Sequence, residues 1–116
     1  MGDDMLLLEK IILQEKSRIE KMISMYETEL LSLPHGTLVK KTINGKEYYY
    51  IQYREGKKVV SKYIGISETK ITDIKSGLER RHQIENILKK LKAEYALAQK
   101  YSEVSIWLFI TVVIWK

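Results

Sequence analysis

The 116-residue sequence contains no cysteine and a single proline, Pro34. Without cysteine the chain cannot form a disulfide, a cysteine-ligated zinc site or a thiol nucleophile. This absence fits a reducing compartment, and we expect a cytoplasmic protein. The start of the chain, Gly2-Asp3-Asp4, is acidic where a secretory signal is basic, so no signal peptide is expected. The scarcity of proline leaves long segments free to form uninterrupted helices.

The usual catalytic and cofactor motifs are also missing. The sequence has no P-loop and no GxGxxG, HExxH or GxSxG pattern. Its two histidines, His35 and His82, are far apart, and the neighbouring residues Arg80, Arg81 and His82 would point in different directions on a helix. We therefore expect no enzymatic activity, no catalytic residues, no cofactor and no metal site.

Positive charge is present but unevenly distributed. The net charge is +5, and residues 34–65 carry seven basic and two acidic residues, whereas residues 1–33 carry four and seven. Such a basic segment indicates an anionic partner, most often nucleic acid. The alternative is that its lysines only protect the edges of a small sheet from aggregation.

The hydrophobic spacing predicts one domain with helix, sheet and helix in that order. Residues 5–33 have apolar residues at helical spacing and contain neither glycine nor proline, and Pro34 ends this segment. Residues 37–64 predict three short strands, and residues 67–101 predict a second helix that Ser76-Gly77 could break in two. The expected fold class is α+β: a long antiparallel helical hairpin with a three-stranded antiparallel β-meander between the helices.

Two turns set the register of the predicted sheet. Asn44-Gly45 indicates a type I′ turn, which places Val39 opposite Tyr50. The second turn contains Gly56 and has two interpretations, a two-residue turn at Glu55-Gly56 or a three-residue turn with Gly56 in the left-handed conformation. We prefer the three-residue turn, because it places most apolar side chains on one face of the sheet.

The preferred turn predicts one face packed on the helices and one open, basic and aromatic face. The packed face would hold Leu38, Tyr49, Ile51, Tyr53, Val59 and Tyr63. The open face would hold Lys41, Tyr48, Tyr50, Gln52, Lys58 and Lys62. Tyrosine rings can stack on bases and cations can contact phosphates, although the strong β propensity of tyrosine also accounts for its abundance here. The predicted binding residues are Lys40, Lys41, Tyr48, Tyr50, Arg54, Lys58 and Lys62.

The last segment, residues 104–115, reads VSIWLFITVVIW and is almost entirely apolar. Twelve residues are too few to span a bilayer as a helix, which needs about 20. The segment could extend the second helix into an oligomer interface, add a strand to another chain, or dip into a membrane. We favour burial in a homo-oligomer or against residues 5–8, because antiparallel helices bring these two apolar ends together, and we do not expect a membrane partner.

The segment LPHGTLVKKTINGKEYYYIQYREGKKVVSKYIG, residues 33–65, carries a resemblance. With its flanking helices it resembles small uncharacterised proteins of Gram-positive bacteria and their mobile elements, over about residues 5–101. It is similar, more weakly, to the arm-type DNA-binding domain of phage and transposon integrases, which implies a sheet placed in the DNA major groove. This chain departs from that domain in its long leading helix.

These observations predict a non-enzymatic protein that binds nucleic acid through a basic, tyrosine-rich sheet face. Two alternatives remain open at the level of sequence. One is a phage or mobile-element inhibitor, of the anti-defence or anti-CRISPR type, that acts on a nucleic-acid-binding enzyme of the host. The other is a structural coiled-coil oligomer.

Overall fold

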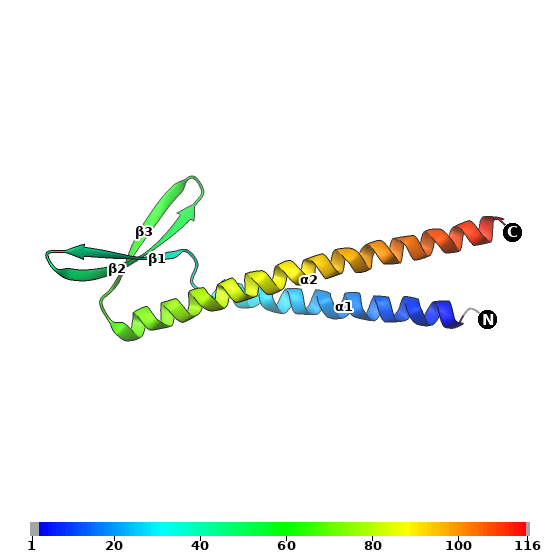
Figure 1. The fold of residues 1–116 in the computed structure, drawn as a ribbon, viewed down its shortest axis with the longest axis horizontal. Coiled ribbons are helices and arrows are strands. Elements are labelled where there is room, and N and C mark those ends of the chain that lie inside the picture. The colour runs from blue at the N-terminus through cyan, green and yellow to red at the C-terminus, as the bar shows by residue number, and fades with distance from the viewer. Residues whose placement is uncertain (1–2, 116) are drawn as a thin grey trace. The chain divides into compact units, whose positions relative to one another are not determined.

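The computed structural model describes residues 3–115 and contains two helices and one three-stranded sheet (Figure 1). The elements are α1 (Asp3–Ser32), β1 (Thr37–Ile43), β2 (Lys46–Glu55), β3 (Lys58–Gly65) and α2 (Glu68–Trp115). The strand order is β1-β2-β3, and both strand pairs are antiparallel. This confirms the predicted α+β class, with a β-meander between two helices. The described residues form two compact units, which we call the helix-pair unit (up to residue 28 and from residue 86) and the sheet unit (residues 29–85).

In the helix-pair unit, α1 and the second half of α2 lie side by side and run in opposite directions (Figure 1). Its buried side chains are Ile19, Leu88 and Leu91, each less than 10% exposed. Helical spacing brings these residues onto one stripe of each helix, and the two stripes face each other. Each helix thus buries its apolar stripe against the other.

Polar contacts between the two helices define their register. The Lys16 ammonium donates a hydrogen bond to the side chain of Gln99, and the Tyr95 hydroxyl donates one to Glu20 Oε1 at 2.7 Å. The carboxylate of Glu20 raises the pKa of the Tyr95 hydroxyl through that hydrogen bond. Residue 16 of α1 therefore lies at the level of residue 99 of α2.

In the sheet unit, the carbonyl end of α1 is capped by Arg81 of α2. The Arg81 guanidinium donates to the backbone carbonyls of Leu30 (2.7 Å), Leu33 (3.0 Å) and Pro34 (2.7 Å). The last carbonyls of a helix have no hydrogen-bond donor within the helix, and they carry a partial negative charge. The guanidinium supplies both the missing donors and the opposite charge. From the sequence alone, Arg81 had no expected role beyond pointing in a different direction from Arg80 and His82.

The possible break near Ser76-Gly77 is absent, and α2 is continuous from Glu68 to Trp115. A β-carbon built at Gly77 would lie 2.6 Å from both Cγ and Cδ of Pro34. Glycine is therefore used here because the turn after α1 passes too close to α2 for any side chain. The sequence left a break possible because, without the neighbouring turn, the glycine reads only as a weakness of the helix.

The apolar segment 104–115 is helical and continues α2, so the interpretation as an added strand is wrong. The described apolar side chains of this segment are exposed, and so are Leu7 and Leu8 near the start of α1, so these two apolar ends do not bury each other. Met5 and Leu6 lie outside the residues whose side chains are described. We call this part of the helix-pair unit the apolar end; its exposed apolar residues are Leu7, Leu8, Ile11, Leu13, Leu97, Tyr101, Val104, Trp107, Leu108, Ile110, Val112, Val113 and Ile114. No helix in the described part of the chain combines the length and apolar character needed to cross a membrane.

Candidate functional site

The first hairpin of the sheet has the register that its turn predicts. Asn44 and Gly45 both have positive φ, 52° and 79°, as a type I′ turn requires. Val39 pairs with Tyr50 and Lys41 pairs with Tyr48. Residues that pair directly across two antiparallel strands project from the same face, so Lys41, Tyr48 and Tyr50 share one face of the sheet.

The second hairpin differs from both predicted turns. Glu55 pairs with Lys58, so the loop consists of Gly56 and Lys57. Gly56 has φ 65°, and among the described non-glycine residues only Asn44 has positive φ. Glycine at the first central position, followed by a residue of negative φ, is the arrangement of a type II′ turn. Both sequence interpretations placed Gly56 at the end of the turn, which shifts the register.

This register changes the composition of the two faces. Tyr63 pairs with Tyr50 and Val59 pairs with Arg54, which moves both residues to the face predicted to be open. Lys62 pairs with Ile51 and Lys58 with Glu55, which moves both lysines to the opposite face. The open face therefore consists of Thr37, Val39, Lys41, Ile43, Lys46, Tyr48, Tyr50, Gln52, Arg54, Val59, Ser61 and Tyr63. The covered face consists of Leu38, Lys40, Thr42, Glu47, Tyr49, Ile51, Tyr53, Glu55, Lys58, Val60, Lys62 and Ile64.

Three tyrosines form a contiguous cluster on the open face. The ring centroid of Tyr63 lies 5.3 Å from that of Tyr50 and 6.2 Å from that of Tyr48, with interplanar angles of 51° and 50°. The Lys41 ammonium lies 4.8 Å from the centroid of the Tyr50 ring, within range of a cation–π interaction. Tyr63 is 49% exposed, whereas Tyr48 and Tyr50 are half-buried. The cluster is thus held in place by its own contacts and still reaches solvent.

The acidic residues of the sheet all lie on one of its two faces. The open face carries the cations of Lys41, Lys46 and Arg54, and the described strands place no carboxylate on it. Both acidic residues of the sheet, Glu47 and Glu55, lie on the covered face.

The covered face neutralises part of its own positive charge. Lys40 forms an ion pair with Glu47 at 2.7 Å, and this partner raises the pKa of the Lys40 ammonium. Glu55 lies directly opposite Lys58. An anionic ligand would therefore meet uncompensated positive charge on the open face and partly paired charge on the other.

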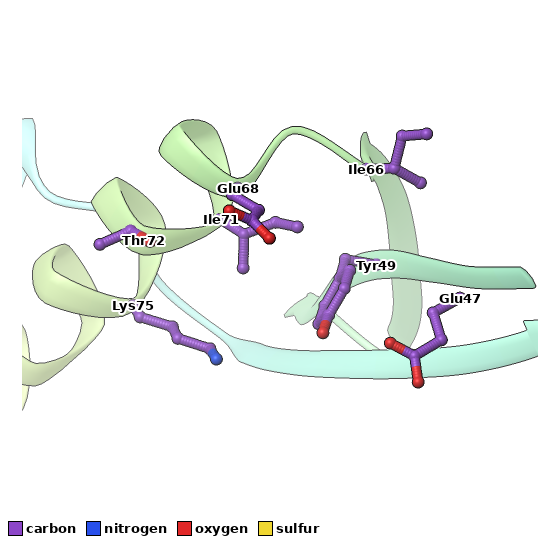
Figure 2. Close-up of a pocket in the computed structure, with 7 residues that line it drawn as sticks. All are labelled: Glu47, Tyr49, Ile66, Glu68, Ile71, Thr72 and Lys75. Atoms are coloured by element: carbon purple, nitrogen blue, oxygen red, sulfur yellow. The ribbon is translucent and has the colours of Figure 1, made fainter.

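The covered face packs on the beginning of α2. Ile51 and Ile64 of the sheet and Ile71 of α2 are all less than 10% exposed. A shallow pocket remains where strand and helix meet, lined by Glu47, Tyr49, Ile66, Glu68, Ile71, Thr72 and Lys75 (Figure 2). The pocket is lined by aliphatic side chains and by charged side chains of both signs. This lining is what the edge of a helix–sheet contact provides, and it indicates no particular ligand.

The histidines do not form a site. His35 packs its ring against the edge of Tyr53, with centroids 4.8 Å apart. His82 is exposed on α2. Within the described residues, no group of three or more histidine, aspartate or glutamate side chains is arranged to hold a metal ion.

Four of the seven predicted binding residues therefore share the open face, namely Lys41, Tyr48, Tyr50 and Arg54. The other three, Lys40, Lys58 and Lys62, lie on the covered face. Sequence reasoning missed Lys46 and Tyr63, which the register adds to the open face. A glycine at the first position of a two-residue turn was the available signal, because Gly-X is the type II′ sequence.

Comparison with known proteins places this chain in a family. Searches among curated proteins and among solved structures found no match. The profile of a domain of unknown function, DUF6788, matches residues 7–73, from the first turns of α1 through the whole sheet to the start of α2. The match covers more than half of the chain and includes every residue of the open face. The chain therefore belongs to the DUF6788 family.

Proposed function

We propose that this protein binds nucleic acid, without catalysis, through the open face of its sheet. The observation that carries the proposal is the composition of that face: a three-tyrosine cluster flanked by three cations and, within the described sheet, no carboxylate. Cations contribute sequence-independent attraction to phosphates, and aromatic rings provide stacking surfaces for unpaired bases. Such a partner is found in the cytoplasm, and we propose that compartment for the protein.

The salt dependence of binding tests the contribution of the cations. If Lys41, Lys46 and Arg54 each neutralise one phosphate of a duplex, the logarithm of the affinity falls with a slope of about −2.7 against the logarithm of the salt concentration. Affinity then decreases about 40-fold between 50 and 200 mM salt. Fluorescence anisotropy with labelled duplex and single-stranded oligonucleotides of DNA and RNA measures this slope.

A matched pair of charge reversals makes the test specific to the open face. The variant carrying Lys41→Glu and Arg54→Glu should lose most of its affinity and about 1.8 units of the slope, because two of the three phosphate contacts are removed. The control carrying Lys58→Glu and Lys62→Glu has the same change in net charge, but on the covered face, and should bind with the wild-type slope. Equal losses in the two variants, or a wild-type affinity that does not respond to salt, would refute the proposal.

The tyrosine cluster gives a second, independent readout. Replacing Tyr50 by leucine keeps an apolar side chain of strand-compatible size but removes the stacking surface. Stacking is worth about 1–3 kcal/mol per base, so single-stranded affinity should fall about 5- to 150-fold. The salt slope should stay unchanged, because no phosphate contact is lost.

A further inference from the structure

We propose that the apolar end of the helix-pair unit docks against the apolar end of a second copy of this chain. The proposal concerns the helices and is independent of nucleic-acid binding by the sheet. Thirteen large apolar side chains are between 44% and 74% exposed there, four on α1 and nine on α2. Burying a fully exposed side chain of this size removes roughly 60–120 Å² from water. These side chains are on average a little over half exposed, so together they offer roughly 450–900 Å². This reaches the area that one partner contributes to a standard interface, about 800 Å².

The spacing of residues on α2 indicates a helical partner. Toward α1, the helix presents a stripe at Leu88, Leu91, Tyr95 and Ala98, in steps of three and four. A second stripe, exposed, runs through Leu97, Tyr101, Val104 and Leu108, also in steps of four and three. The two stripes are offset by one residue, which is about 100° around a helix. A helix with two neighbouring apolar stripes is suited to a four-helix bundle, in which it contacts two partners.

The corresponding stripe on α1 is apolar over the same end of the unit. Leu8 and Ile11 are about half exposed, and the next positions of that stripe, Glu15 and Arg18, form an exposed ion pair. Lys16 lies opposite Gln99, so the apolar part of the α1 stripe lies at the level of α2 beyond about residue 100. Both helices thus change from charged to apolar at the same level, and two copies related by a two-fold axis would bury matching stripes.

The charge around the apolar end favours a protein partner over a membrane surface. Residues 3–13 and 100–115 contain four acidic residues and two basic ones. Helices that lie on anionic membranes display a strongly basic polar face, which this end lacks. No helix among the described residues contains an apolar stretch long enough to cross a bilayer.

Sedimentation equilibrium of the full chain tests the proposal. The wild type should have a mass near twice the 13.7 kDa of one chain. The variant carrying Val104→Glu and Leu108→Glu should be monomeric at concentrations where the wild type is dimeric. The dissociation constant of its dimer should be at least 100-fold higher than that of the wild type. The control carrying Met25→Glu and Leu31→Glu changes two side chains that are 68% and 88% exposed outside the apolar end, and it should keep the wild-type mass.

Single-cysteine variants keep the test informative if the glutamate variant misfolds, because the natural chain has no cysteine. Under air oxidation Leu108→Cys should form an interchain disulfide at least ten times faster than Leu31→Cys. Flotation with phosphatidylcholine and phosphatidylglycerol vesicles tests the membrane alternative. A monomeric wild type that floats with vesicles, a mass above the dimer, or equal crosslinking of the two cysteine variants would overturn the proposal.

Discussion

The contact between Gly77 of α2 and Pro34 leads to a prediction of unusual sign. Replacing a glycine inside a helix by alanine normally stabilises a protein by about 1 kcal/mol, because alanine has the higher helix propensity. At Gly77 the new methyl group would lie 2.6 Å from two ring carbons of Pro34, well inside van der Waals contact. Forcing a methyl group into a filled site costs about 1–3 kcal/mol. We therefore expect Gly77→Ala to lower the free energy of unfolding, by up to about 2 kcal/mol.

A double-mutant cycle separates the clash from the propensity. Gly77→Ala, Pro34→Ala and the double variant are unfolded in urea and followed by circular dichroism at 222 nm. In the Pro34→Ala background the ring is gone, so Gly77→Ala should stabilise the protein by about 1 kcal/mol. The coupling free energy should accordingly be about 1–3 kcal/mol.

The reasoning fails if Gly77→Ala alone stabilises the protein by about 1 kcal/mol, or if the two substitutions are additive. Either result would mean that α2 does not pass against the turn as described. The glycine would then be a tolerated weakness of the helix, as its sequence alone suggested.

Two further predictions concern the arginines of α2. Arg81→Met keeps much of the apolar stem but removes the donors to the carbonyls of Leu30, in α1, and of Leu33 and Pro34, directly after it. The free energy of unfolding, measured in urea, should therefore fall by about 2–4 kcal/mol, and a change below about 0.5 kcal/mol would contradict the capping role. Arg80 donates to both carboxylate oxygens of Glu29, at 2.8 and 3.0 Å, and this lowers the pKa of Glu29. Because the folded pKa is depressed, the stabilisation is present above the ordinary carboxyl pKa and is lost as the pH falls through the lowered value. The difference in Tm between wild type and Glu29→Gln should thus be positive at pH 7 and vanish in strongly acidic solution; a difference that persists there would contradict the assignment.

Up to residue 101, the sequence determined the element types, their order and one of the two hairpin registers. Each of these depends on local chemistry: apolar residues at helical spacing, a proline that stops α1, and Asn44-Gly45, which tolerates the positive φ of a type I′ turn. Four of the predicted binding residues follow from that first register alone, because β1 and β2 pair as expected.

Only the tertiary structure decided which face Lys58, Lys62, Val59 and Tyr63 occupy. Glycine accepts positive φ at any position of a turn, so Gly56 is compatible with several registers, and a shift of one residue exchanges the two faces of β3. Sorting apolar residues onto one side gave the wrong answer, because the open face keeps exposed Val59 and Tyr63 while Lys62 shares a face with buried Ile51.

Contacts between segments distant in the chain were likewise invisible in the sequence. Gly77 serves the approach of Pro34, and Arg81 serves the end of α1, 47 to 51 residues away. No local pattern marks such residues, because their roles depend on where another element passes in space. The apolar segment 104–115 was readable as helix or strand for the same reason: its β-branched and aromatic residues fit both, and only its continuity with α2 made it helical.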